Sequence, residues 1–147
     1  MKAKDIMIKN VKTISSEMNA REALNLLQKL QISGLPVIDD KKKLIGMFTE
    51  KEILASILPS YLSRVGRFVY EENSKAVKQK INNFPSLKVK DLMRLDVVTI
   101  DEDATLCEVA HAMLTQRVRR TPILNKNREV VGIISRGDVM NALFQGL

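Results

Sequence analysis

The chain has 147 residues, of which 45% are hydrophobic and 28% charged, and its formal net charge is +7. This length suits one compact domain or two small modules with a shared core, and no apolar run approaches the ~20 residues of a membrane span. A single cysteine, Cys107, excludes an internal disulfide framework and a multi-cysteine zinc cluster. The N-terminal residues lead into no signal-type apolar region, so a cytoplasmic location with no membrane partner is expected.

An internal repeat organises the chain. Gly46 falls on Gly132 when the sequence is shifted by 86 residues, and Lys4-Asp5-Ile6-Met7 then falls on Lys90-Asp91-Leu92-Met93. The register continues without a gap to Leu58 and Phe144. We therefore expect one structural unit at 1–58, a linker at 59–87 and a second copy of the unit at 88–147.

The first copy predicts the element order β-α-β-β-α. A short β segment at 13–14 precedes an amphipathic helix, whose apolar stripe is Ala20, Ala23, Leu24, Leu27 and Leu30. Two apolar runs at 35–38 and 44–48 then predict a hairpin. The charged residues Lys41-Lys42-Lys43 between them are interpreted as its solvated turn. A second helix over 53–58 completes a mixed α/β unit.

The linker has apolar positions of its own. Pro59 should end the preceding helix, because proline lacks a backbone donor and clashes with the turn before it. A helical pattern follows at Tyr61, Leu62, Val65, Phe68 and Val69, and a second one at Val77, Ile81 and Phe84. The first of these helices could line a partner interface or cover the core of its own unit.

The two copies together resemble the cystathionine-β-synthase (CBS) domain family. The resemblance rests on Lys-x-Asp-Ile/Leu-Met, on Leu35-Pro36-Val37-Ile38-Asp39 and Thr121-Pro122-Ile123-Leu124-Asn125, and on the Gly-led turns at 46–52 and 132–138. It implies that the repeats pack through their sheets as a pseudo-two-fold pair, a Bateman module. Such pairs have two clefts, commonly bind AMP, ADP, ATP or S-adenosylmethionine, commonly form homodimers and usually regulate another protein.

The Gly-led turns carry a Ser/Thr-x-x-acid pattern that has two interpretations. It can be a capping box, in which the hydroxyl accepts a helix amide and the acid reaches back. Thr49 and Glu52 fit that rule well, whereas Ser135 and Asp138 fit it less well because aspartate is shorter. In the family the aspartate binds the ribose hydroxyls. We therefore expect Asp138 to bind ribose and Glu52 to act as a cap.

Arg119 and Arg120 precede Pro122, where the resemblance implies side chains that point into the cleft. Guanidinium groups bind phosphate oxygens through a planar fork of donors. The alternative is a pair of surface arginines at a helix C-terminus, which the helix dipole favours. The first repeat has Ser33-Gly34 instead, which carries no charge but would let an adenine approach the backbone.

The predicted sites therefore differ between the repeats. The nucleotide site is assigned to Ser135, Asp138, Arg119, Arg120, Thr121, Pro122, Ile134, Ser33, Gly34 and Thr99. A weaker second cleft is assigned to Thr49, Glu52, Thr13 and Pro36. If only one cleft works, ligand should saturate at one molecule per chain. No cofactor is required in this interpretation.

No catalytic or metal site is expected. Cys107 and His111 are one helical turn apart, but two ligands make no zinc site, and ordinary helix packing is the interpretation. There is no nucleophile elbow or Walker loop and only one histidine. The hypothesis is a non-enzymatic adenosine sensor that relays its occupancy to an unidentified effector protein. The alternatives are a nucleic-acid-binding module that exploits the positive charge, or a structural dimerisation module without ligand.

Overall fold

The computed structural model describes residues 1–58 and 74–145, which form two compact units. Unit 1 comprises Met1–Thr13, Ile38–Ile45 and Asp96–Leu147, and unit 2 comprises Ile14–Val37 and Gly46–Leu95. Each unit therefore takes most of its residues from one sequence repeat and a short piece from the other. The linker helix predicted around Tyr61–Val69 lies outside the described residues.

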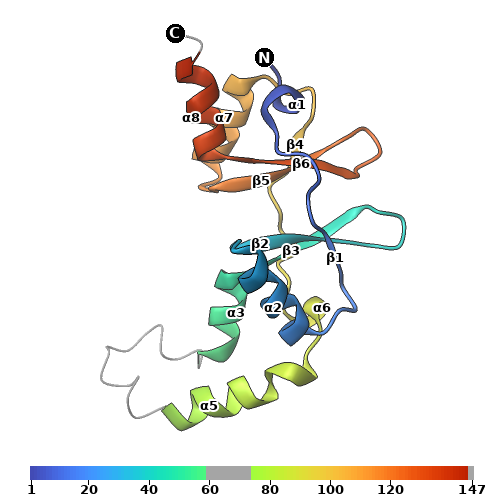
Figure 1. The fold of residues 1–147 in the computed structure, drawn as a ribbon, viewed down its shortest axis with the longest axis vertical. Helices are drawn as coiled ribbons and strands as arrows, with labels where there is room; N and C mark the ends of the chain where they lie inside the picture. The colour runs from blue at the N-terminus through green and yellow to red at the C-terminus, as the bar shows by residue number, and fades with distance from the viewer. Residues whose placement is uncertain (59–73, 146–147) are drawn as a thin grey trace. The chain divides into compact units, whose positions relative to one another are not determined.

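Unit 1 contains α1 (Ala3–Ile6), β4 (Ile100–Asp101), α7 (Leu106–Thr115), β5 (Arg120–Leu124), β6 (Val130–Ser135) and α8 (Arg136–Gln145). Its sheet has the order β4-β5-β6, in which β4 pairs in parallel with β5, and β5 pairs antiparallel with β6. Figure 1 shows α1, α7 and α8 on one side of this sheet. A buried apolar cluster fills the space between them, formed by Ala3, Ile100, Val109, Met113, Ile123, Ile134 and Val139.

Unit 2 is built around the equivalent elements β1 (Ile14–Ser15), α2 (Ala20–Leu30), β2 (Gly34–Ile38), β3 (Leu44–Thr49) and α3 (Glu50–Ile57). The sheet order is β1-β2-β3. It also contains α5 (Ser74–Asn83), the 3-10 helix η2 (Phe84–Ser86) and α6 (Val89–Leu92). The predicted order β-α-β-β-α is thus confirmed in both copies, as is the helical pattern that precedes Pro85.

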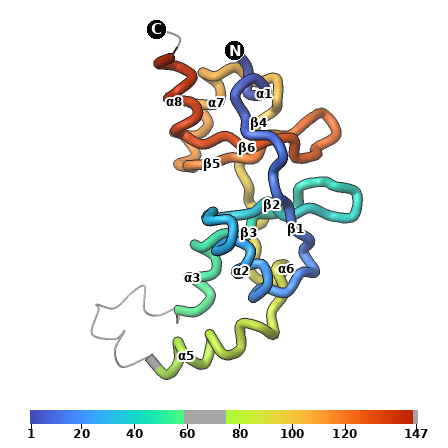
Figure 2. The backbone as a smooth tube through the Cα atoms, in the orientation of Figure 1, coloured from blue at the N-terminus to red at the C-terminus, as the bar shows by residue number. Residues whose placement is uncertain are grey.

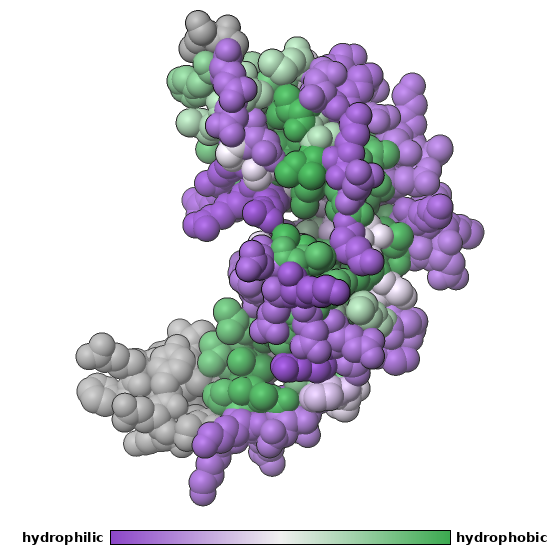
Figure 3. Space-filling view, in the orientation of Figure 1, coloured by the Kyte–Doolittle hydropathy of each residue, from purple (hydrophilic) through white to green (hydrophobic). Residues whose placement is uncertain are grey.

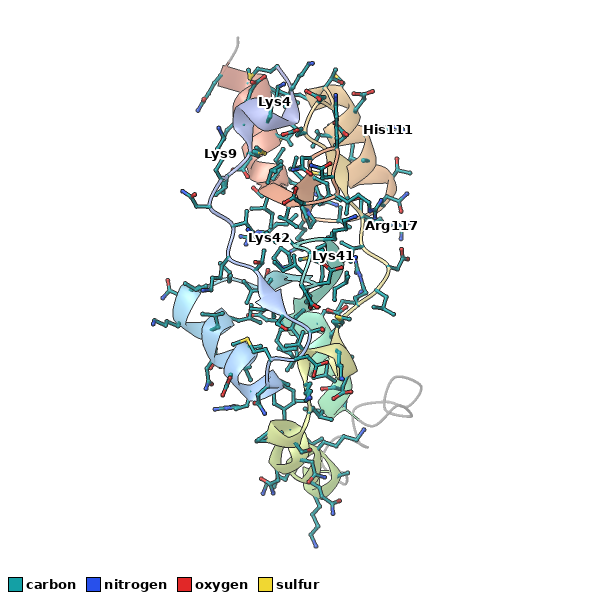
Figure 4. The ribbon with its side chains drawn as sticks, turned by 90° about the vertical axis from the view of Figure 1, so that its right-hand side faces the viewer. Lys4, Lys9, Lys41, Lys42, His111 and Arg117 are labelled. Carbon is teal, nitrogen blue, oxygen red and sulfur yellow. The ribbon has the colours of Figure 1, made fainter. Side chains whose placement is uncertain are left out.

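The turn between β2 and β3 folds on an aspartate. Asp39 Oδ1 accepts from the amides of Lys41 at 2.9 Å and Lys43 at 3.0 Å, and Lys42 has the left-handed backbone (φ 65°) of a tight turn. All three lysines are exposed, and Figure 4 labels Lys41 and Lys42 there. The interpretation of the lysine run as a solvated hairpin turn is confirmed.

Each unit is completed by a short segment that precedes the other repeat's first strand. In unit 1, Ile8 exchanges two backbone hydrogen bonds with Ile133 in β6, at 2.9 and 3.0 Å, and Figure 2 shows the start of the chain running past this strand. In unit 2, Arg94 exchanges two with Met47 in β3, at 2.8 and 2.9 Å. The short helices α1 and α6 in these segments were not predicted.

The two repeated glycines allow these segments to approach the strands. A Cβ at Gly132 would lie within 2.9 Å of the Met7 Cβ, and one at Gly46 within 2.9 Å of the Arg94 carbonyl oxygen and 3.0 Å of the Met93 sulfur. Side-chain atoms do not fit at such separations. The paired glycine and methionine of the repeat are therefore one packing contact, made once in each unit.

We expect Gly46→Ala to lower the free energy of unfolding by about 1–3 kcal/mol, because the added methyl must displace backbone at residue 94. Gly137→Ala is the matched control, since a Cβ there meets only Ser135 Oγ at 3.6 Å and alanine favours a helix. Urea denaturation of both variants measures the difference. Equal stability of the two variants would contradict the packing role of Gly46.

Unit 2 also has a charge triad on its surface. Glu17 accepts from Lys88 Nζ at 2.7 Å and Lys90 Nζ at 2.9 Å. These hydrogen bonds, with the attraction of both lysines, lower the pKa of Glu17 to about 2. The triad joins the segment before β4 to the start of α2, although its exposure limits its contribution to stability.

The sign of its pH dependence follows from that lowered pKa. The stabilisation by Glu17 should be present above its ordinary pKa of 4.5 and disappear as the pH falls through about 2. We expect Glu17→Gln to be slightly less stable than the wild type at pH 7, and the difference to shrink between pH 4.5 and 2. Urea denaturation at several pH values checks this. A difference that is independent of pH would rule out the carboxylate as its source.

Candidate functional site

The predicted polar residues of the second repeat meet where β5 begins and β6 ends. Arg120 is opposite Ser135 in the β5–β6 register, and α8 starts at the next residue. The amide of Arg136 donates to the carbonyl of Arg119 at 2.9 Å, which fixes the start of α8 against the entry to β5. Four predicted site residues are therefore brought to one edge of unit 1: Ser135, Asp138, Arg119 and Arg120.

Ser135 and Asp138 form a reciprocal capping box at the start of α8. The Asp138 amide donates to Ser135 Oγ at 3.1 Å, and the Ser135 amide donates to Asp138 Oδ2 at 2.8 Å. The expectation that aspartate fits this role poorly is wrong. Asp5 and Asp91 make the same backward hydrogen bond in α1 and α6, at 2.7 and 2.8 Å. The shorter side chain reaches the amide without difficulty.

The equivalent turn of unit 2 is arranged differently. Thr49 makes no side-chain cap for α3, and its hydroxyl donates instead to the Glu52 carboxylate. The prediction that Thr49 and Glu52 form the capping box is therefore also wrong. The Glu52 carboxylate is thus turned toward the Thr49 hydroxyl, and no amide of the first turn of α3 donates to that hydroxyl.

Asp138 keeps one carboxylate oxygen for another partner. Oδ2 is used by the cap, whereas Oδ1 makes no hydrogen bond within the described part of the chain, and the side chain is half-buried. A half-buried carboxylate oxygen beside a strand end can accept hydroxyl donors from a ligand. Capping and ligand binding are compatible at this residue.

Three arginines belong to the same strand end. Arg119 and Arg120 are exposed, as the surface-arginine alternative expects, but they follow α7 rather than ending it, so the helix dipole does not account for them. Arg136 was not predicted, although it is the second residue of the Ser-x-x-Asp turn, and its Nε donates to the carbonyl of Val118 at 2.9 Å. Among the described residues, none of the three forms an ion pair with a carboxylate. The edge is positively charged.

The remaining predicted residues of this repeat are less accessible. Thr121, Pro122 and Ile134 are buried. The Thr121 hydroxyl donates to the Val98 carbonyl at 2.7 Å, which ties β5 to the segment before β4. Thr99 follows in that segment and is half-buried. These residues hold the edge in place.

Ser33 and Gly34 belong to unit 2, together with Thr49 and Glu52. The Glu50 amide donates to the Ser33 carbonyl at 2.9 Å, the counterpart of the bond from Arg136 to Arg119. A Cβ at Gly34 would lie 2.8 Å from Thr49 Cγ2, so a side chain there has no room. Pro36 is buried in β2, whereas Thr13 belongs to unit 1 and is half-buried.

Unit 2 also has an open apolar pocket of about 320 Å³. The pocket is lined by Arg21, Leu24, Glu50, Ile53, Leu54, Ile57, Ile81 and Phe84. None of the predicted site residues lines it. Its walls offer few hydrogen-bonding groups, so it does not suit an adenosine.

Cys107 and His111 lie on an exposed face of α7, opposite the buried Val109 and Met113. Their interpretation as helix-packing residues is therefore wrong. His111 Nε2 is 3.5 Å from Thr115 Oγ1. Within residues 1–58 and 74–145, no three His, Cys, Asp or Glu side chains are placed to hold a metal ion, and no helix is long and apolar enough to cross a membrane.

Ser135→Ala should lower the free energy of unfolding by about 1 kcal/mol, because the first turn of α8 loses its cap. Thr49→Val, which removes a hydroxyl of similar size from a position that makes no cap, should cost less. Urea denaturation of both variants provides the comparison. A larger loss for Thr49→Val would show that α3, not α8, depends on its hydroxyl.

The sequence matches a known domain family in two places. Residues 3–59 and 89–145 each match the family model of the CBS domain. The chain is 32% identical over 139 residues to inosine-5'-monophosphate dehydrogenase of Methanocaldococcus jannaschii. It is also 32% identical over 130 residues to the chloroplastic CBS domain-containing protein CBSX1 of Arabidopsis thaliana. These matches cover 95% and 84% of the chain, which spans only 23% and 55% of the two relatives.

Solved structures of CBS pairs share the fold. Arabidopsis thaliana CBSX2 in complex with AMP superposes with a TM-score of 0.74 at 25% identity, covering 98% of this chain and 96% of that one. A CBS domain pair in complex with 5'-methylthioadenosine and S-adenosylmethionine superposes with a TM-score of 0.70 at 28% identity, covering 99% and 97%.

Proposed function

The chain belongs to the CBS-domain family, and we propose that it is a regulatory module that binds an adenosine-containing ligand at the β5–β6–α8 edge of unit 1. The candidates are AMP, ADP, ATP and S-adenosylmethionine. The observation that carries the proposal is that a half-buried carboxylate, Asp138, and two exposed arginines belong to one strand end. The related CBS pairs in complex with AMP, and with 5'-methylthioadenosine and S-adenosylmethionine, support the ligand class.

Each group at this edge has a chemical role in the proposal. Asp138 Oδ1 accepts the ribose hydroxyls while Oδ2 remains in the cap of α8. Arg119 and Arg120 bind the phosphate oxygens, because exposed guanidinium groups that pair with no carboxylate of the described residues gain charge-assisted hydrogen bonds there. Thr121 and Val98 hold β5 in position. The edge of unit 2 that carries Thr49 and Glu52 has no arginines at the equivalent positions, so one ligand per chain is expected.

The proposed output is regulatory and not catalytic. Binding changes the balance between two conformations of the protein only by the difference in ligand affinity between them. That change is relayed to an effector protein. We also propose that the protein is a cytoplasmic homodimer. Exposed apolar side chains on α8, Met140, Leu143 and Phe144, support an interface there, and Figure 3 shows hydrophobic surface over this helix.

Calorimetric titration with AMP, ATP and S-adenosylmethionine tests the ligand class. We expect at least one of them to bind at sub-millimolar concentration and to saturate at one per chain. In the double variant Asp138→Ala/Arg120→Ala, the ligand-induced increase in melting temperature should vanish while the oligomeric state is kept. No binding by any of the three would exclude the sensor and leave the structural dimerisation module and the nucleic-acid-binding module.

A second titration tests the nucleic-acid alternative. Its support is the net charge of +7, and it predicts binding to DNA or RNA whose affinity falls steeply with salt. A titration with a mixed-sequence oligonucleotide at two salt concentrations distinguishes it from nucleotide sensing. Tight oligonucleotide binding without mononucleotide binding would favour this alternative.

A further inference from the structure

The two units carry different charges at three equivalent backbone positions, and at one of them the charge is reversed. The first helical residue of α8 donates its amide to residue 119, and that of α3 donates its amide to residue 33, both at 2.9 Å. The backbone frame is therefore the same at both edges. Unit 1 places Arg136, Arg119 and Arg120 on this frame, whereas unit 2 places Glu50, Ser33 and Gly34 there.

Arg136 is held at that edge by the backbone of residues 118 and 119. Its Nε donates to the Val118 carbonyl at 2.9 Å, and its amide donates to Arg119. These two bonds tie Arg136 to residues 118 and 119, and only the bond to Val118 uses a guanidinium nitrogen. The two terminal nitrogens make no hydrogen bond with the described residues and remain available as a planar pair of donors.

We propose that Arg136 selects the charge of the ligand, by binding its phosphate together with Arg119 and Arg120. This proposal rests on the proposed adenosine site. Three guanidinium groups around one carboxylate leave an excess of positive charge, which a phosphate neutralises through charge-assisted hydrogen bonds. Glu50 presents a negative charge at the same backbone position of unit 2, so a phosphate is repelled from that edge.

The three arginines favour some of the candidate adenosine ligands over others. Adenosine monophosphate, diphosphate and triphosphate all carry the anionic group that this edge requires. S-adenosylmethionine has a single carboxylate beside a cationic sulfonium and an ammonium group, and this net positive charge is disfavoured by the arginines. The unit 1 edge therefore takes phosphorylated adenosines in preference to S-adenosylmethionine or unphosphorylated adenosine, and Arg136 contributes the selectivity without contacting the nucleoside.

Charge reversal at Arg136 tests this selection. Calorimetry with AMP and with adenosine separates the phosphate contribution from that of the nucleoside. In Arg136→Glu we expect the affinity for AMP to fall about tenfold to a hundredfold, because a charge-assisted contact becomes a repulsion. The affinity for adenosine should change by less than about threefold.

Lys126→Glu is the matched control. It makes the same change of charge on an exposed residue of unit 1, but in the turn between β5 and β6 rather than at the strand end. We expect it to leave both affinities unchanged at 0.15 M salt, where distant surface charges are screened. An equal loss of AMP binding in Lys126→Glu would show that net charge, and not Arg136, decides the affinity.

The other outcomes are also decisive. If Arg136→Glu weakens AMP and adenosine equally, Arg136 acts only by holding the Val118–Arg119 backbone, and charge selection is overturned. If AMP binding is unchanged, Arg136 does not contact the phosphate. If Arg136→Glu fails to fold, Arg136→Gln replaces it, with a smaller loss expected for AMP alone. If the wild type binds S-adenosylmethionine but neither AMP nor ATP, charge selection is overturned while the adenosine sensor stands. If none of these ligands binds, the proposed function itself is refuted.

Discussion

Each unit depends on a short β bridge between an edge strand and a segment that belongs to the other sequence repeat. Ile8 pairs with Ile133 in unit 1 and Arg94 with Met47 in unit 2, through two backbone hydrogen bonds each. Gly132 and Gly46 make this approach possible, since a methyl group on either would overlap the arriving segment. A unit cut strictly at the repeat boundary would therefore leave β3 or β6 without its outer partner and would expose unpaired backbone groups.

This constraint also determines where the candidate site lies. The bridge fixes β6 on its outer side, and the β5 pairing fixes it on its inner side. The strand then ends at Ser135 in one defined position, and the reciprocal cap with Asp138 starts α8 there. The polar residues of the site are thus carried by a rigid strand end, which suits a site whose donors must be placed before the ligand arrives.

The sequence was sufficient to predict the features that depend on hydrophobic period and on repetition. The order β-α-β-β-α, the hairpin turn at 39–43 and the family all followed from them. The sequence did not predict that α1 belongs to the unit of the second repeat and α6 to the unit of the first. The two segments have closely similar motifs, so neither motif indicates which sheet it joins. The exposure of Cys107 and His111 was missed for another reason. A spacing of four residues places two side chains on one helix face without saying which face is buried.

The capping turns show where rules about side-chain length reach their limit. Glu108 in α7 makes a full capping box with Thr105, whereas Glu52 in α3 bonds to the Thr49 hydroxyl. Glutamate therefore has the reach for either arrangement, and the sequence pattern does not distinguish them. The Ser-x-x-Asp pattern specifies only the hydroxyl and the acid, so it gave no reason to predict a role for Arg136. In the structure Arg136 is the residue that follows β6.

The divergence between the two edges is itself evidence about function. The two repeats have the same type of residue where packing restricts the choice. These positions are the glycine that contacts a methionine, the proline of the middle strand and the apolar residues on the inner face of the helix. Arg119, Arg120 and Arg136 are exposed, and among the described residues their side chains make a single hydrogen bond, from Arg136 Nε to the Val118 carbonyl. Folding of this frame does not require positive charge there, since unit 2 forms the same backbone bond with Ser33 and Glu50. In the proposed function, this cluster of like charges, which the fold does not need, is the binding site of an anion.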